Sequence, residues 1–251
     1  MNTKTSLLIL GDSLLKGVFY DETMQRHRVD PSGCLTKLYE SYGSRLHNAS
    51  RFGLTTTVAL PRLLRLLDEY PDAKTVLIEL GGNDCDYDWP AIALDPKGTH
   101  FCHTPLQGYC LNLEKMVRLC REQGKNPVLA TLPPIDAERF FLWVAKTPSD
   151  QVAIMNWLQE REVIERHQAQ YDEAIRTVAT RLECPVLDLR TPLLALPHWR
   201  SLLCSDGIHL REEGQAIVCA EVQTFLQQHH ALGGTPTCQS PTAFSPTPRP
   251  I

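Results

Sequence analysis

Short apolar runs recur along the first three quarters of the chain, each bounded by turn-forming residues. Their lengths suit buried strands, and the gaps between them leave room for a helix. The five runs are 6–10, 45–49, 75–80, 127–132 and 185–189. Because strands that alternate with helices build βαβ units, the pattern predicts an α/β fold around a parallel sheet.

Amphipathic helical patterns fill several of these gaps. Apolar residues recur at helical spacing over 58–70 and over 111–123, so one face of each segment is expected to dock on the sheet. The longest pattern predicts a single helix over 150–181, with Ser149 or Asp150 as its N-cap.

Two long stretches, 86–108 and 133–149, show no such periodicity. Each follows a predicted strand, so we expect them to form walls or lids of a site at the carboxyl end of the sheet.

A last helix is predicted over 212–228, after which Gly, Pro, Ser and Thr dominate. This composition predicts a folded domain over 1–230 and a disordered tail over 231–251.

The composition is typical of a soluble globular protein, with 43% hydrophobic and 22% charged residues among 251. The net charge of −4 provides no positive field that would attract nucleic acid or anionic lipid. The first apolar run is too short for a signal peptide or a membrane span. Nine cysteines without a C-x-x-C pair are typical of reduced thiols. We therefore expect a cytoplasmic protein without stable membrane association.

Glycine and polar residues gather in four segments that follow predicted strands or precede the last helix. In open parallel sheets, ligands bind outside the carboxyl ends of the strands, where such segments meet. The segments are 11–17, 48–53, 81–84 and 205–209. Together they offer a hydroxyl, backbone amides beside glycine, a carboxamide and an imidazole, which are the groups that acyl transfer requires.

Ser13, Asp206 and His209 have the residue types of a hydrolytic triad. A serine hydroxyl is a weak nucleophile until an imidazole removes its proton, and the imidazole needs a carboxylate that fixes its tautomer. Asp206 lies three residues before His209, close enough to reach the ring nitrogen that faces away from the serine. The amides of Ser13 and Gly53 and the side chain of Asn83 could stabilise the oxyanion that forms during the reaction.

The four segments resemble the sequence blocks of the GDSL, or SGNH, hydrolase superfamily of esterases and lipases. The blocks are Gly-Asp-Ser-Leu at 11–14, the glycine at 53, Gly-x-Asn-Asp at 81–84 and Asp-x-x-His at 206–209, in the family's order. The resemblance implies a three-layer α/β/α sandwich with a flavodoxin-like parallel sheet of five strands. It also implies ester hydrolysis without a metal or an organic cofactor.

The resemblance assigns a role to each matching residue. It implies that Ser13 is the nucleophile, that His209 acts as base and then as acid, and that Asp206 orients His209. Gly53 and Asn83 would complete the oxyanion hole with the Ser13 amide. The family often has a small polar residue where this chain has Leu15, which affects the rim of the pocket and not the nucleophile.

Four further residues beside these blocks are predicted to contact the substrate. Tyr87 and Trp89 belong to the aromatic stretch after Asn83 and are expected to form a wall of the acyl or alcohol pocket. The other two are Asp12 and Ile208, which adjoin the nucleophile and the imidazole in sequence.

Each block also has a purely structural interpretation. The Gly-Asp-Ser tripeptide could be a capped turn, Asn83 an Asx-turn residue, and Gly53 a loop glycine with positive φ. Asp206 could cap the last helix, with His209 in its first turn. Under that interpretation the loss of His209 would scarcely matter, whereas the catalytic interpretation predicts loss of turnover.

Two clusters resemble metal sites without fulfilling their patterns. Asp84, Asp86 and Asp88 alternate as in a calcium loop, but tryptophan stands where that loop needs glycine and aspartate where it needs glutamate. The second cluster is His100, Cys102 and His103, whose adjacent placement strains zinc geometry. We therefore predict no metal and no cofactor.

The sequence thus predicts a serine esterase that cleaves a small or medium acyl ester through an acyl-enzyme intermediate. Within this class an acetyl ester of a carbohydrate is the first choice, because no long amphipathic surface helix is present to engage a lipid bilayer. A lysophospholipase or acyl-thioesterase of the same fold is the nearest alternative, and a non-catalytic ligand-binding module is another. The expected partner is a small-molecule ester and not nucleic acid, and the oligomeric state is left open.

Overall fold

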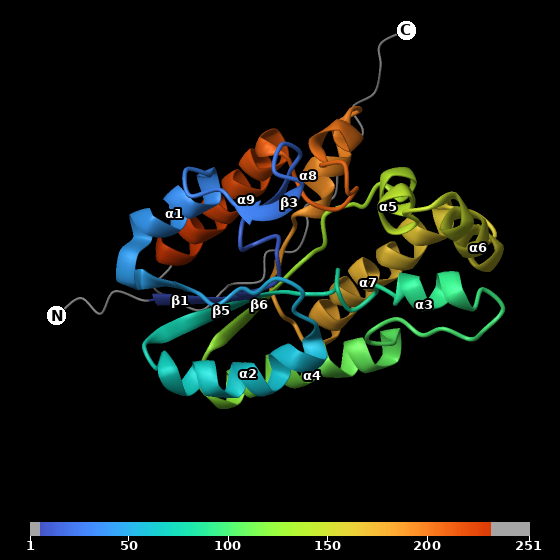
Figure 1. The fold of residues 1–251 in the computed structure, drawn as a ribbon. Coiled ribbons are helices and arrows are strands. Elements are labelled where there is room, and N and C mark those ends of the chain that lie inside the picture. The colour runs from blue at the N-terminus through green and yellow to red at the C-terminus, as the bar shows by residue number, and fades with distance from the viewer. Residues whose placement is uncertain (1–5, 232–251) are drawn as a thin grey trace, which may run out of the picture.

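The computed structural model describes residues 6–231 and has a five-stranded parallel sheet at its centre (Figure 1). The strands are β1 (Ser6–Gly11), β4 (Leu46–Asn48), β5 (Ala73–Glu79), β6 (Asn126–Ala130) and β7 (Val186–Leu187). They lie in the order β4-β1-β5-β6-β7, and all neighbours are parallel. Counted among these strands alone the order is 2-1-3-4-5, that of flavodoxin-like sheets, so the predicted fold and its five strands are confirmed.

Helices cover both faces of the sheet and complete three layers (Figure 1). One face carries α2 (Thr56–Glu69), α4 (Leu106–Glu122) and α7 (Glu162–Arg181), and the other carries α1 (Cys34–Tyr42), α8 (Arg190–Leu194) and α9 (Glu212–Ala231). Strand side chains alternate between these layers: Leu8 and Leu10 of β1 pack into the first, and Leu7 and Ile9 into the second. Strands buried on both faces read as continuous apolar runs, which is why the sequence pattern located them.

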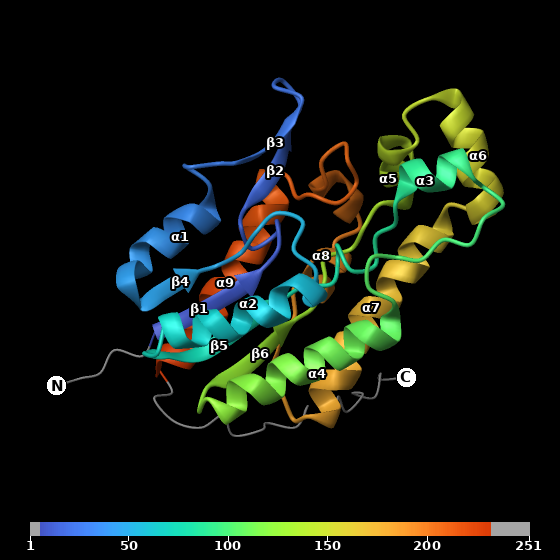
Figure 2. The same cartoon turned by 60° about the horizontal axis from the view of Figure 1, so that its bottom comes forward.

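The two stretches expected as loops, 86–108 and 133–149, are partly helical. They contribute to a group of three helices at one end of the sheet (Figure 2), which are α3 (Trp89–Leu94), α5 (Ala137–Val144) and α6 (Pro148–Leu158). We call these three helices the cap. Its apolar side chains form a third core, distinct from the two that flank the sheet, with members that include Trp89, Phe140, Phe141, Ile154 and Leu158.

The single helix predicted over 150–181 is wrong, because the structure has α6 and α7 in its place. Gln159 adopts a left-handed φ of +69°, which ends α6, since a right-handed helix requires negative φ. The N-cap is Thr147 and not Ser149 or Asp150. Thr147 Oγ1 accepts the Asp150 amide while the Asp150 carboxylate accepts the Thr147 amide, a reciprocal capping box.

An antiparallel hairpin of β2 (Val18–Asp21) and β3 (Arg26–Val29) forms a second sheet that the sequence pattern did not predict. Two short 3₁₀ helices, η1 (Gly43–Arg45) and η2 (Trp199–Leu202), complete the elements described.

No helix among the described residues is both long and apolar enough to cross a membrane. The tail predicted over 231–251 lies outside the described residues, apart from its first residue, which ends α9.

Candidate active site

Three predicted site residues from two distant segments form one chain of hydrogen bonds. Ser13 follows β1, while Asp206 and His209 lie in the turn before α9. Ser13 Oγ is 3.0 Å from His209 Nε2, and His209 Nδ1 is 2.6 Å from Asp206 Oδ2. The imidazole therefore has a hydroxyl at one nitrogen and a carboxylate at the other, which is the geometry that a general base needs.

The Asp206 carboxylate is fully buried and held by several donors. Its Oδ1 accepts the amides of Ile208 at 3.1 Å and His209 at 3.0 Å. Burial by itself would raise the pKa of Asp206, but the hydrogen bond and charge of His209 outweigh it and hold that pKa below its ordinary value. Because α9 begins only at Glu212, Asp206 does not cap that helix.

A glycine lets the turn that carries these two residues pack against the cap. Gly207 has a left-handed φ of +76°, and a Cβ at this position would lie 2.6 Å from the Phe140 amide nitrogen. The Gly207 carbonyl accepts the Asp136 amide at 2.9 Å, just before α5 begins. The start of α5 is therefore hydrogen-bonded to the turn that carries Asp206 and restrains the position of that turn.

Asn83 lines the same pocket as Ser13. Its Nδ2 donates to Asp12 Oδ2 at 2.9 Å, whereas its contact with the Leu54 carbonyl is long at 3.5 Å. Asp12 therefore sets the orientation of the carboxamide. Gly53 lies on the neighbouring loop after β4, where it is exposed and has a φ of +70°.

Asp12 forms a buried carboxyl pair with Glu79, a residue at the end of β5 that sequence reasoning did not select. Glu79 Oε2 accepts the Asp12 amide at 3.3 Å. Burial raises the pKa of Asp12 to about 6, against the lowering effects of the Leu14 amide and the charge on His209. Burial and then the charge of Asp12 raise the pKa of Glu79 well above its ordinary value. The signal that could have found this pair was the glutamate at position 79, which directly follows the apolar run 76–78.

A pocket with a mainly apolar lining extends from Ser13 toward the cap, and its space including the open mouth is about 960 Å³. The predicted contact residues Tyr87, Trp89 and Ile208 line it, as Asp12 does. The remaining apolar lining comes from the loop after β6, the cap and the start of α7, and includes Leu132, Pro133, Ile135, Phe140, Leu158, Val163 and Ile164. Apolar pockets of this kind bind hydrocarbon groups.

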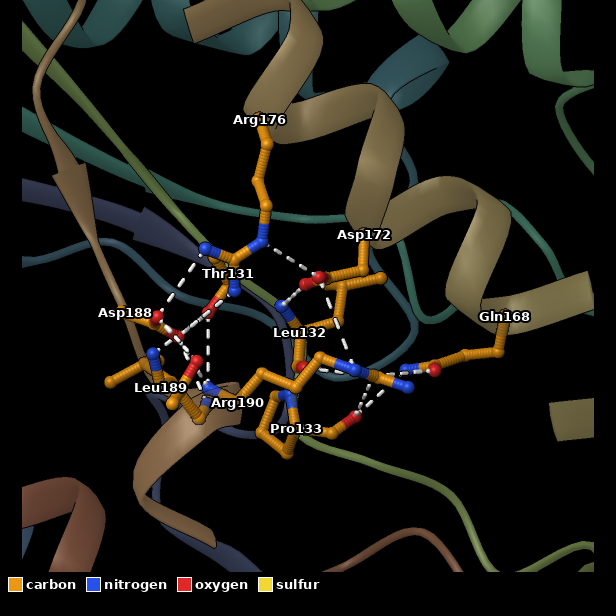
Figure 3. A network of polar contacts seen from close by, with 10 residues as sticks. Thr131, Leu132, Pro133, Gln168, Asp172, Arg176, Asp188, Leu189 and Arg190 are labelled. Atoms are coloured by element: carbon orange, nitrogen blue, oxygen red, sulfur yellow. Dashed lines mark hydrogen bonds and ion pairs between the residues drawn. The ribbon is translucent and has the colours of Figure 1, made fainter. Parts of the chain in front are cut away.

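One wall of this pocket is fixed by a charged network (Figure 3). The buried Asp172 accepts the Leu132 amide at 2.9 Å and pairs with Arg176. Arg190 donates to the Leu132 carbonyl at 3.2 Å and to Gln168 Oε1 at 2.8 Å. The chain leaving β6 is therefore held by hydrogen bonds on both its amide and carbonyl sides, at the point where Leu132 lines the pocket.

The residues of the two rejected metal patterns contact different partners. Asp84 is fully buried and accepts the Thr56 amide at 2.9 Å, Asp86 accepts Trp89 Nε1 at 2.7 Å, and Asp88 caps α3. The members of the second pattern bond to three separate groups: His100 to the Asp95 carbonyl, Cys102 to the Tyr171 hydroxyl and His103 to the Asn83 carbonyl. Asp84 thus joins the segment after β5 to the start of α2.

His27, on β3, is a second site residue, besides Glu79, that the sequence did not reveal. Its Nε2 is 2.8 Å from Asp206 Oδ2, the oxygen that His209 also contacts. The ligand-type atoms of these three residues lie within 4.8 Å of one another, the spacing of a metal-binding group. Both nitrogens point at a single carboxylate oxygen at hydrogen-bond distance, so we assign the arrangement to charge-assisted hydrogen bonds.

Known sequences similar to this chain carry a common family description. The sequence profile described as the GDSL-like Lipase/Acylhydrolase family matches residues 9–217. The chain is 29% identical over 162 residues to the GDSL esterase/lipase At5g45920 of Arabidopsis thaliana, covering 63% of this chain and 59% of that protein. It is 24% identical over 155 residues to the GDSL esterase/lipase WDL1 of Oryza sativa subsp. japonica, and this match covers 61% of this chain and 53% of that protein. The match thus spans somewhat more than half the length of these curated relatives.

Solved structures share the fold. The lipase/acylhydrolase from Enterococcus faecalis superposes with a TM-score of 0.61 at 20% identity, covering 90% of this chain and 97% of that one. The psychrotrophic esterase EstA from Pseudoalteromonas sp. superposes with a TM-score of 0.56 at 20% identity, covering 90% of this chain and 98% of that one. At these identities the likeness concerns the architecture alone.

Proposed function

The chain belongs to the GDSL-like lipase/acylhydrolase family, and on this premise we propose that it is a serine esterase with Ser13 as nucleophile. The observation that carries the proposal is the hydrogen-bond chain from Ser13 through His209 to the buried Asp206. A non-catalytic binding module would need the pocket but not these proton-transfer partners, which disfavours that alternative.

In the proposed reaction, His209 Nε2 takes the proton of Ser13 Oγ as that oxygen attacks the ester carbonyl. The tetrahedral intermediate collapses when the same nitrogen returns the proton to the leaving alcohol, which gives the acyl-enzyme. Water then loses a proton to His209 and attacks the acyl carbon, and the proton finally returns to Ser13 as the acid leaves. Asp206 stays ionised throughout and stabilises the imidazolium.

Asn83 and the amides of Ser13 and Gly53 are the proposed donors to the oxyanion. Asp12 supports the role of Asn83 because it orients the carboxamide toward the pocket that Ser13 lines. A donor already aimed at the developing charge lowers the barrier without reorganising during the reaction.

We expect Asn83→Ala to lower kcat by roughly 10²–10³-fold, about 2.7–4 kcal/mol of transition-state stabilisation. Steady-state hydrolysis of a p-nitrophenyl ester measures the change, with Asn126→Ala at the exposed start of β6 as a matched control. A fall of less than threefold, in a variant that melts at the temperature of the native protein, would contradict the oxyanion role.

The pocket favours an acyl chain of medium length over the acetyl group that the sequence first suggested. An acetyl group would leave the apolar lining supplied by Phe140, Leu158 and Ile164 without contact, whereas a longer chain would bury against it. Burial of one methylene contributes ~0.8 kcal/mol, which is roughly fourfold in kcat/KM. We therefore propose medium-chain acyl esters as the substrate class.

Rates across the p-nitrophenyl acetate, butyrate, hexanoate, octanoate and dodecanoate esters test this proposal, with an acetylated xylo-oligosaccharide alongside. We expect kcat/KM to rise from acetate to at least hexanoate, by up to roughly fourfold per methylene. A maximum at acetate, or faster cleavage of the acetylated sugar, would restore the first hypothesis. No cleavage of any ester would favour the binding module.

A further inference from the structure

We propose that His27 is a positioning residue for the triad and that the β2–β3 hairpin braces the turn at 204–209. This inference rests on the proposed function, because it concerns how Asp206 is held for catalysis. The hairpin lies beside the turn (Figure 2), although 179 residues separate His27 from Asp206 along the chain.

The contact requires His27 to act as a donor. Asp206 is ionised, because its pKa lies below the ordinary value, so its Oδ2 can only accept. His27 Nε2, 2.8 Å away, must therefore carry a proton. With the two backbone amides on Oδ1, the carboxylate accepts four hydrogen bonds, two on each oxygen.

The hairpin has a second attachment at the adjacent residue of the turn. Glu22, between β2 and β3, accepts the Ser205 amide at 3.2 Å and the Ser205 hydroxyl at 3.0 Å. Two successive residues, Ser205 and Asp206, are thus bonded to the same hairpin. This arrangement restrains both the backbone and the carboxylate, which one isolated contact would not do.

The His27 ring is itself fixed by aromatic neighbours. Its centroid lies 5.2 Å from that of Tyr20, its partner across the hairpin, 5.4 Å from Phe52 and 5.7 Å from Trp143 of α5. These contacts set the direction of Nε2. They also define the rival interpretation, in which His27 serves only as an aromatic packing residue between the hairpin and the cap.

Two substitutions separate these interpretations. His27→Phe keeps a ring among the aromatic neighbours but removes the donor, whereas His27→Gln removes the ring and keeps an N–H at about the position of Nε2. A hydrogen bond to a charged group contributes enough to expect a fall in kcat of roughly ten- to hundredfold in His27→Phe. Acylation and deacylation use the same imidazole, so we expect KM to change by less than about twofold.

We expect His27→Gln to keep kcat within about threefold of the native protein, since its amide still donates to Asp206. His47→Phe is the matched control, because His47 of β4 stacks on Tyr70 outside the site. Melting temperatures of all variants identify any that fail to fold, and the comparison then rests on the folded ones.

Each other outcome overturns the proposal. Native kcat in His27→Phe with a loss in His27→Gln would assign a packing role, and unchanged kcat in both would exclude a positioning role. Loss of native activity in EDTA with recovery in zinc would replace the hydrogen bond by a metal contact. Failure of the proposed function is distinguishable, because the native protein would then cleave no ester at all.

Discussion

Ser13→Ala is expected to abolish ester hydrolysis, with kcat lower by roughly 10⁴-fold or more. The substitution removes the protein atom that the proposed mechanism bonds to the acyl group. His209 Nδ1 would keep its 2.6 Å hydrogen bond to Asp206 Oδ2, but the imidazole would have no hydroxyl to deprotonate. Any residual rate would come from water and from whatever stabilisation the oxyanion donors still provide.

A fluorophosphonate probe checks the same prediction without a substrate. The native protein should be labelled on the peptide that contains Ser13, and Ser13→Ala should take up no label. Ser41→Ala is a suitable control, because the Ser41 hydroxyl only donates to the Leu38 carbonyl within α1. Label on another residue, or a Ser13→Ala variant that keeps more than a tenth of the native rate, would exclude Ser13 as the nucleophile.

Asp206→Asn is expected to lower kcat by as much as ~10⁴-fold while the fold is retained. Two backbone amides occupy Oδ1, so an asparagine here would keep its carbonyl oxygen on that side and turn its NH₂ toward His209. The NH₂ would donate to Nδ1 and force the imidazole proton onto Nε2. That nitrogen could then no longer accept the proton of Ser13.

Burst and steady-state kinetics with a p-nitrophenyl ester measure this effect, and the rate of fluorophosphonate labelling should fall with kcat. Asp68→Asn provides a control, since Asp68 is exposed on α2 and does not line the pocket. A rate within tenfold of the native value would leave Asp206 with only its turn-stabilising bonds to the backbone.

The three central strands β1, β5 and β6 were predictable from the sequence because they are buried on both faces. Their runs are mostly apolar, with Ser6 the one polar residue of 6–10 and Thr75 and Glu79 the two of 75–80, so the sequence alone indicates these strands. The break at Gln159 left no such trace, because neither Gln159 nor its neighbours Leu158 and Glu160 is a glycine or proline that would mark the end of a helix in the sequence. The helices α3 and α5 were not predicted, because prolines and clustered aromatic residues interrupt the helical periodicity of 86–108 and 133–149.

The candidate site likewise contains residues that the sequence indicated and residues that it did not. Ser13, Asn83, Asp206 and His209 lie in loops at the carboxyl ends of strands or before the last helix, where sequence blocks and sheet geometry together indicate them. His27 lies on a strand whose residues are Arg-His-Arg-Val, and that segment has neither an apolar pattern nor a motif. Its role depends on a contact between distant segments, which no local property of the sequence encodes.

The cap has a core of its own, and this separation has an evolutionary consequence. Side chains such as Phe140 and Leu158 belong to that core and also face the pocket, whereas the sheet is stabilised by two other cores. Substitutions of cap side chains such as Leu158 would change the apolar lining of the pocket without removing a side chain from the two cores that flank the sheet. A lineage of such proteins could diversify its substrates through substitutions in α3 and α6, while α5 is constrained by its contact with the Asp206 turn.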